Sequence, residues 1–134
     1  MATIFSKIIG GEIPGQIVYR DDVCAAFLDL EPLTQGHTLV VPLVEVDQWT
    51  DLQPETINHL MQTAARIGRA QLQAFGGHRV GIIIQGFEVP HAHIHVFPTS
   101  GPEDFDFARK QHRSPQLLAE DAGALQAALA ADQG

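Results

Sequence analysis

One long stretch of this chain has helical spacing, and a shorter one precedes it near the N-terminus. From Pro54 to Phe75 apolar residues recur three or four positions apart, and Gly76-Gly77 is suited to the end of a helix. Apolar residues at the same spacing follow Thr3, a capping residue, and stop before Gly10. The pattern predicts a short N-terminal helix and one main helix over residues 54–75.

Five shorter segments are rich in alternating or β-branched apolar residues, which is typical of strands. They cover residues 16–20, 23–28, 38–41, 80–84 and 91–97. A closing alanine-rich helix is expected over Leu117 to Ala130. Because one long helix interrupts the strands, where a parallel sheet would have repeating strand-helix units, the order predicts an α+β fold with a five-stranded antiparallel sheet.

Length and composition limit the class of protein. With 134 residues, 45% of them apolar, the chain fits a single domain over 1–134 with a real core. No apolar run approaches the roughly 20 residues that span a membrane, and no export signal is visible at the N-terminus, so a cytoplasmic location is expected. The formal charge of −8, with scattered basic residues, disfavours binding to long nucleic acids. Cys24 is the only cysteine, and we expect it to be buried and without a catalytic role.

The segment His91-Ala92-His93-Ile94-His95 carries the chemistry. Side chains alternate along a strand, so the three histidines are expected on one face and the apolar residues on the other. The outer Cα atoms would lie about 13 to 14 Å apart, so the three rings cannot all contact one small centre in the same way. This favours a division of labour in which His93 attacks phosphorus while its neighbours bind oxygen atoms or handle protons. A backbone carbonyl near His91 is the expected acceptor for the ring proton of His93.

Two other interpretations of the histidines stay open. Three imidazoles opposite an apolar face would be costly for a purely structural role. Two histidines at this spacing can also chelate zinc, with His37, Glu88 or Asp29 as a third ligand.

The motif His91 to Phe97 resembles the signature of the histidine triad (HIT) family, in which histidines alternate with hydrophobic residues. The resemblance extends upstream through Ile4 to Ile9, Ala26 to Asp29 and Gly36 to Pro42. It covers residues 3–98, and residues 99–134 form an unmatched C-terminal extension.

The resemblance implies a HIT-like fold, a homodimer, and hydrolysis or transfer at the α-phosphorus of a purine nucleotide through a nucleotidyl-histidine intermediate. The resemblance also implies that the reaction requires no metal or organic cofactor. By resemblance His93 is the nucleophile, and His91, His95 and His37 surround the phosphate. Asp29 would hold the ribose hydroxyls, and the remaining substrate-binding residues would be Ile4, Phe5, Ile8, Phe27, Leu39, Gln85 and Val89.

The sequence departs from the family pattern in the loop before the triad. Where the family commonly has several residues that grip phosphate, only Gln85 offers a neutral amide. A Glu88 carboxylate about 4 Å from a phosphate oxygen would repel it by roughly 4 kcal/mol at an effective dielectric constant of 20. We expect Glu88 to point away; the alternative is a substrate cation that it meets, such as the amine of a phosphoramidate or an aminoacyl group. In the extension, Phe105 and Phe107 are expected to dock onto a partner subunit or the nucleotide.

Three hypotheses follow. The first is an enzyme, a nucleoside phosphoramidase or nucleotidyl hydrolase of broad purine specificity. The second is a non-catalytic nucleotide-binding module. The third is a metal-dependent protein that uses the histidine strand.

Overall fold

The computed structural model describes residues 2–132. In this part of the chain the regular elements, in order, are α1 (Ile4–Ile9), β1 (Ile17–Arg20), β2 (Cys24–Leu28), β3 (Thr38–Pro42), α2 (Pro54–Phe75), β4 (Arg79–Ile83), β5 (Ile94–Thr99) and α3 (Pro115–Ala131), with three short 3-10 turns between them. The strands form one antiparallel sheet in the order β1-β2-β3-β5-β4. The predicted α+β fold with a five-stranded antiparallel sheet is confirmed.

The two helices predicted in the N-terminal half of the chain, α1 and α2, are present where the pattern predicts them. Thr3 caps α1 by accepting a hydrogen bond from the Ser6 amide, and α2 has the predicted bounds. At the C-terminus the helix begins two residues earlier than expected, at Pro115, behind the capping side chain of Ser114. With 17 residues, α3 is a second long helix where the pattern predicted only one.

The last strand is shorter than predicted, because it begins at Ile94 and leaves His91 and His93 in the segment before it. The backbone there bonds outside the sheet: the His91 amide donates to the Val89 carbonyl at 2.8 Å, and the Ala92 amide donates to the Val46 carbonyl at 2.7 Å. The expectation that all three histidines lie on one strand is therefore wrong. Alternation of the side chains nevertheless continues through this segment, since Ala92 and Ile94 both face the main core.

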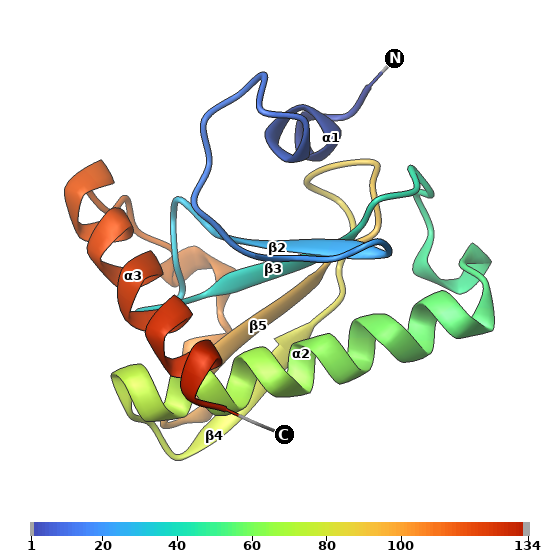
Figure 1. Cartoon of the computed structure of the whole chain (residues 1–134). Coiled ribbons are helices and arrows are strands. Elements are labelled where there is room, and N and C mark those ends of the chain that lie inside the picture. The colour runs from blue at the N-terminus through green and yellow to red at the C-terminus, as the bar shows by residue number, and fades with distance from the viewer. Residues whose placement is uncertain (1, 133–134) are drawn as a thin grey trace.

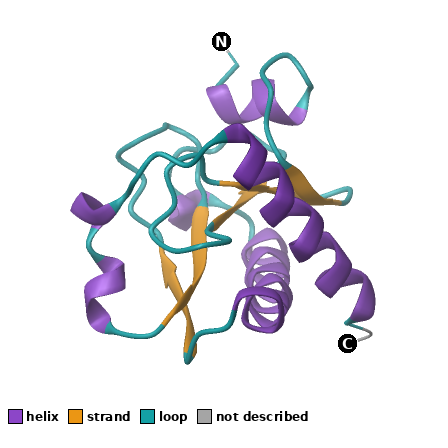
Figure 2. Cartoon of the chain, turned by 90° about the vertical axis from the view of Figure 1, so that its left-hand side faces the viewer, coloured by secondary structure: helices purple, strands orange, loops and turns teal. Residues whose placement is uncertain are grey.

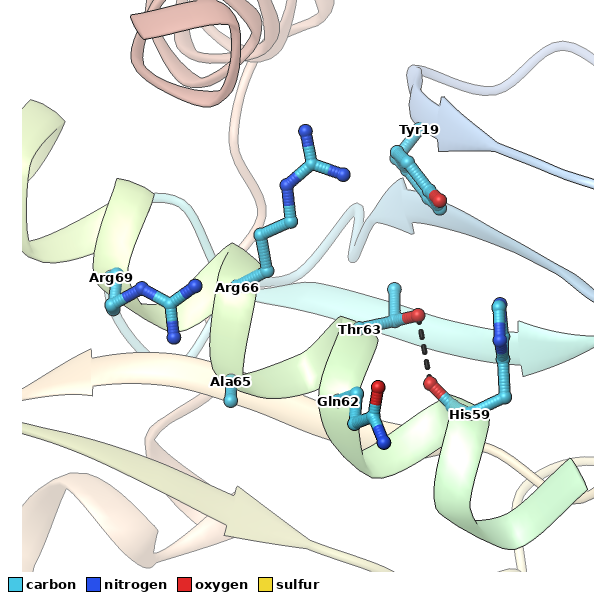
Figure 3. Close-up of a pocket in the computed structure, with 7 residues that line it drawn as sticks. All are labelled: Tyr19, His59, Gln62, Thr63, Ala65, Arg66 and Arg69. Carbon is cyan, nitrogen blue, oxygen red and sulfur yellow. Dashed lines mark hydrogen bonds between the residues drawn. The ribbon is translucent and has the colours of Figure 1, made fainter. Parts of the chain in front are cut away.

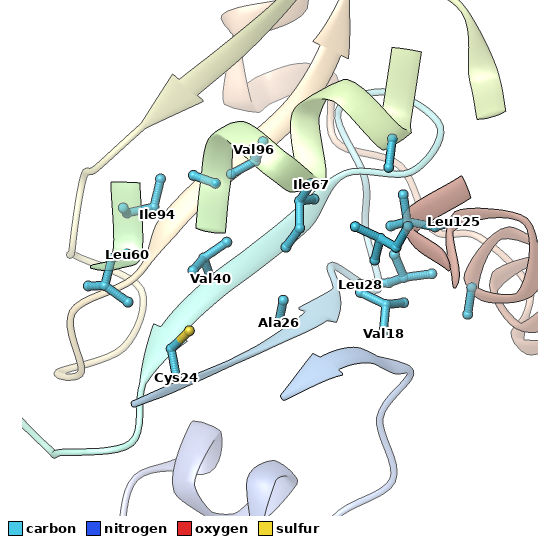
Figure 4. Close-up of a cluster of buried hydrophobic side chains, with 14 of the residues drawn as sticks. Val18, Cys24, Ala26, Leu28, Val40, Leu60, Ile67, Ile94, Val96 and Leu125 are labelled. Atoms are coloured by element: carbon cyan, nitrogen blue, oxygen red, sulfur yellow. The ribbon is translucent and has the colours of Figure 1, made fainter. Parts of the chain in front are cut away.

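The sheet has two different faces (Figure 1). The helices α2 and α3 cover one of them, and α1 lies over the other; Figure 2 shows the strands between α1 and α2 from the side. The main core is built from alternate strand residues such as Ala26, Val40 and Val96, packed against Ile67 of α2 and Leu125 of α3 (Figure 4). The C-terminal extension is thus part of the packed core, and α1 is free to border a cleft on the opposite face.

Gln71 connects α2 to the strands that carry the histidines. Its side chain is fully buried, and its amide nitrogen donates to the Gly36 carbonyl at 2.8 Å and the Val96 carbonyl at 3.0 Å. Gly36 precedes His37 and Val96 follows His95, so one helix side chain fixes the relative position of both histidines. No helix among residues 2–132 is long and apolar enough to cross a membrane.

Candidate active site

The register of the strands places two of the predicted substrate-binding residues, Phe27 and Leu39, next to the histidine His95. Phe27 of β2 pairs with Leu39 of β3, and Leu39 pairs in turn with His95 of β5. These three side chains form a row across the face that α1 borders. A cleft of about 510 Å³ opens above the row. Its apolar lining contains every apolar residue predicted to bind the substrate, namely Ile4, Phe5, Ile8, Phe27, Leu39 and Val89.

His93 lines this cleft and is oriented by its own backbone. Its Nδ1 lies 2.7 Å from the carbonyl oxygen of His91, which can only accept, so the ring proton is on Nδ1 and the lone pair on Nε2. The ring packs edge-on against Phe5, with centroids 4.9 Å apart. The acceptor predicted from the sequence is therefore present, and Nε2 is left for chemistry in the cleft.

His37 and His95 form a hydrogen-bond chain with a fixed direction. The Leu33 amide donates to Nδ1 of His37 at 2.9 Å, so the proton of His37 is on Nε2. This Nε2 lies 2.9 Å from Nδ1 of His95 and donates to it, which leaves the proton of His95 on Nε2. Burial lowers the pKa of His37 to about 3, against the opposing charge of Asp29. Burial also lowers the pKa of His95, so both rings are neutral at neutral pH.

His91 does not line the main cleft. Its Nε2 donates to the Pro42 carbonyl at 2.8 Å, and its Nδ1 accepts from the Thr3 hydroxyl at 2.6 Å. Because Thr3 is also the cap of α1, His91 links the wall of the cleft to the segment that carries His93. Both ring nitrogens have protein partners, so His91 presents no free nitrogen to the cleft, and His37 likewise reaches the cleft only through His95.

Glu88 points into the site, which corrects the expectation that it faces water. Its Oε1 lies 2.9 Å from Nε2 of His95 and 3.4 Å from Nε2 of His93, while a third of the side chain stays exposed. Burial alone would raise the pKa of Glu88, but hydrogen bonds from its own amide and from Nε2 of His95 outweigh burial, and the pKa lies below the usual value. The directional donor from His95 explains why this loop charge turns inward.

Asp29, the predicted ribose ligand, lies at the same end of the cleft and is paired. Its Oδ1 accepts from the Glu31 amide at 2.9 Å, and its Oδ2 contacts the Lys110 ammonium at 2.7 Å. Oδ2 is also 3.7 Å from Nε2 of His37 and 4.0 Å from Nδ1 of His95. A carboxylate and an ammonium therefore lie directly beside the histidine chain.

Other predicted residues are placed differently. Gln85 is exposed and lies outside the main cleft, in a smaller hollow of about 240 Å³ that His93 also lines. Phe107 packs edge-on against His95 at 5.0 Å between centroids, and Phe105 packs against Phe97 at 4.9 Å. The two phenylalanines thus dock within their own subunit, because the tail folds back over the end of the sheet.

Among residues 2–132, three groups of side chains have the proximity of metal ligands: Asp21 with Cys24 and His59, Asp29 with His37 and His95, and Glu88 with His93 and His95. The distances of 2.9 and 3.4 Å in the last group are close to the ligand separation of a tetrahedral zinc site, about 3.3 Å. The hydrogen bonds oppose it, however. A metal on Nε2 of His95 needs the proton on Nδ1, where the Nε2 proton of His37 already points. In the second group, a metal on Nε2 of His37 would need the ring proton on Nδ1, where the Leu33 amide already donates. In the first group, burial raises the pKa of the Cys24 thiol to about 11, so the thiolate that binds a metal is disfavoured.

A second hollow, of about 360 Å³, lies between α2 and β1 on the other face of the sheet (Figure 3). Arg66, Arg69 and His59 line it. His59 is half-exposed, and its Nε2 lies 2.7 Å from an oxygen of Asp21. The triad is not part of this hollow. The cleft beside α1 is therefore the candidate active site.

Sequence reasoning missed the residues that the tail contributes. Lys110 and His112 line the cleft, although the resemblance left the C-terminal extension unmatched and assigned no site residue to it. A signal was present: three of the eight basic residues, Arg109, Lys110 and Arg113, fall within five positions, so the basic residues are not simply scattered. The Thr3 hydroxyl and the Leu33 amide, which orient two of the histidines, had no recognisable signal.

Comparison with known proteins agrees with this geometry. A family model described as the HIT domain matches residues 10–101. The chain is 36% identical over 100 residues to a purine nucleoside phosphoramidase from Escherichia coli, a match that covers 70% of this chain and 84% of that protein. It is 30% identical over 100 residues to an adenylylsulfatase from Arabidopsis thaliana, which covers 71% of this chain and 51% of that protein. A Zn-bound histidine triad family protein from Mycobacterium smegmatis superimposes with a TM-score of 0.83 and 31% identity, covering 98% of this chain and 95% of that one. Together with the fold and the histidine motif, these matches show that the chain belongs to the HIT domain family.

Proposed function

We propose that this protein hydrolyses purine nucleotides at the α-phosphorus through a nucleotidyl intermediate on His93, and that nucleoside phosphoramidates are its preferred substrates. The observation that carries the proposal is the orientation of His93. Its Nδ1 proton is held by the His91 carbonyl at 2.7 Å, so the lone pair of Nε2 is available beside an apolar cleft. Similarity to a purine nucleoside phosphoramidase supports the same class of reaction.

In the first step Nε2 of His93 forms a bond to phosphorus as the bond from phosphorus to the leaving group breaks. An in-line displacement needs room on both sides of the nucleophile's target. The main cleft offers an apolar slot for the base beside His93. The floor carries only apolar side chains beneath the base, which fits broad purine specificity.

Glu88 favours a leaving group with positive charge on nitrogen. Its carboxylate lies 3.4 Å from Nε2 of His93, so a charge on the group bound to the reacting phosphorus lies within short electrostatic range of it. A protonated phosphoramidate nitrogen takes both electrons of the breaking P–N bond and leaves as a neutral amine. In the second step water attacks phosphorus, Glu88 accepts the proton of the water, and His93 regains its lone pair.

Replacement of Glu88 by glutamine tests this preference. We expect kcat/KM to fall about tenfold for a phosphoramidate of a cationic amine, and to stay equal or rise for a dinucleoside polyphosphate, whose leaving group is an anion. The ratio kcat/KM reports formation of the intermediate and not its hydrolysis, so the second role of Glu88 does not enter. Glu31→Gln removes another carboxylate of the cleft that does not touch the triad and serves as the control. An equal fall for both substrates would contradict the assignment.

The direct test of the reaction is capture of the intermediate. After brief incubation with phosphoramidates, dinucleoside polyphosphates and adenylates, mass spectrometry should find AMP or GMP attached to His93. The second candidate, a nucleotide-binding module without turnover, is favoured by one observation: in this structure the Glu88 carboxylate lies against the nucleophile. It predicts that AMP raises the melting temperature while no substrate yields an adduct.

We also propose that the protein is a homodimer. The edge strand β4 has exposed Val80 and Ile82, 36% and 40% accessible, and Met61 of α2 is 41% accessible. An edge strand with exposed apolar residues is suited to pairing with a second copy. Light scattering should give twice the chain mass of 14.6 kDa, and a monomer at micromolar concentration would refute the proposal.

A further inference from the structure

The cleft has a shortage of positive charge. Its lining includes three carboxylates, those of Asp29, Glu31 and Glu88, and the chain as a whole has a formal charge of −8. The rings of His37 and His95 are neutral at neutral pH. Within the described residues, Lys110 is the only lysine or arginine that lines the cleft. A substrate phosphate that enters the cleft meets one permanent cation.

Lys110 is held at the cleft because residues before and after it in the sequence are packed against the rest of the protein. Before it, Phe107 packs against His95. After it, Arg113 makes two hydrogen bonds, of 2.6 and 3.1 Å, to the buried carboxylate of Asp121 in α3. The backbone of the segment is therefore anchored, and its position does not depend on a bound ligand. The ammonium lies 5.3 Å from the ring centroid of Phe107, which supports the flexible stem of the lysine.

The present partner of Lys110 is a group that a nucleotide would engage. Asp29 Oδ2 accepts from Lys110, and its other oxygen is already bonded to the Glu31 amide. Two ribose hydroxyls can replace the ammonium at Oδ2 without leaving the carboxylate unpaired. The released ammonium then has a phosphate within reach, because Asp29 Oδ2 is only 4.0 Å from the ring of His95.

We propose that Lys110 is the phosphate-binding cation of this cleft, and that nucleotide binding exchanges its contact with Asp29 for one with the substrate phosphate. The inference rests on the proposed function for the identity of the ligand as a nucleotide. It assigns to the C-terminal extension a contact with phosphate, in a chain whose loop before the triad keeps only Gln85 of the residues that commonly grip phosphate. A lysine suits this exchange because its charge sits on a long flexible stem with three rotatable donors.

Adenosine and AMP separate a phosphate contact from every other contribution to binding. We expect Lys110→Met to weaken AMP binding about tenfold in isothermal titration calorimetry at low ionic strength, and to change adenosine binding less than about twofold. Lys110→Arg keeps the charge and should retain most of the preference for AMP. Arg109→Gln removes a neighbouring charge that pairs with Asp104 outside the cleft, and should leave both affinities unchanged. Melting temperatures of the variants establish that each is folded.

The outcomes distinguish this inference from the proposed function. If the wild type forms a His93 adduct but Lys110→Met keeps the ratio of AMP to adenosine affinity, the inference is wrong and the function stands. If Lys110→Met tightens binding of both ligands, Lys110 only covers Asp29, and the inference is again wrong. A Lys110-dependent preference for AMP without any adduct supports the inference and refutes the enzyme. A wild type that binds neither ligand overturns both.

Discussion

Replacement of His93 by alanine is expected to reduce turnover by roughly 10⁴-fold or more, while the affinity for AMP stays within about threefold. The reaction loses the atom that bonds to phosphorus, and the other two histidines of the motif do not replace it: His95 carries its proton on Nε2, and both nitrogens of His91 are bonded to protein. The walls of the cleft are contributed by α1 and the strands, so binding does not depend on this ring.

His59→Ala is the matched control for this variant. His59 also contacts a carboxylate, but it lies in the hollow on the opposite face of the sheet. We expect kcat of this variant to be close to that of the wild type. Single-turnover kinetics together with intact-protein mass spectrometry measure both the rate and the adduct. Turnover of the His93 variant within tenfold of the wild type would mean that another group attacks phosphorus.

The alternation of histidine and apolar residues was enough to predict the essential arrangement of the site. Ala92, Ile94 and Val96 are all in the main core, and His93 and His95 line the cleft opposite. A period of two is a property of extended backbone, so it persists through His93 although the hydrogen-bonded strand begins one residue later. Local rules also sufficed for α1 and α2, whose beginnings are marked by the Thr3 cap and by Pro54, and whose ends are marked by Gly10 and Gly76.

The orientation of Glu88 could not be predicted by the same means. The sequence-based expectation used the general tendency of loop charges to face water. In the structure a neutral histidine presents an N–H to this position, and the direction of that donor is set by the Leu33 amide through His37. A chain of three hydrogen bonds, one of which joins residues 58 positions apart, therefore decides which way one side chain points.

The contribution of the tail is a second case of long-range packing. Lys110 meets Asp29 across 81 positions of sequence, and no periodicity within the tail relates the two residues. The cluster of basic residues was visible, but the face to which it folds depends on how Phe105, Phe107 and Arg113 pack. Residues 99–134 looked like an appendage because they lack the family motif, whereas α3 supplies Leu118 and Leu125 to the main core.

The second large effect is expected at His37, which does not line the cleft. We expect His37→Ala to lower kcat by about 10²-fold and to change KM by less than about threefold. Without the donor from His37, the proton of His95 is free to move to Nδ1, and its Nε2 then turns a lone pair toward the carboxylate of Glu88. The donor that faces the phosphate is lost, while the apolar slot is intact. In a serine protease, a substitution that leaves the wrong histidine tautomer in place costs even more, about 10⁴-fold.

A tautomer effect has a signature that loss of packing does not produce. His37→Gln retains an N–H that can reach Nδ1 of His95, so it should recover kcat to within about tenfold of the wild type. Imidazole ¹⁵N NMR should find the proton of His95 on Nε2 in the wild type and in the glutamine variant, and on Nδ1 or both nitrogens in the alanine variant. Because burial keeps the pKa of His37 near 3, no protonation of His37 itself contributes between pH 5 and 9. An alanine variant with the wild-type tautomer and a low kcat would show that His37 acts through packing, and the directional chain from Leu33 to Glu88 would then have no part in catalysis.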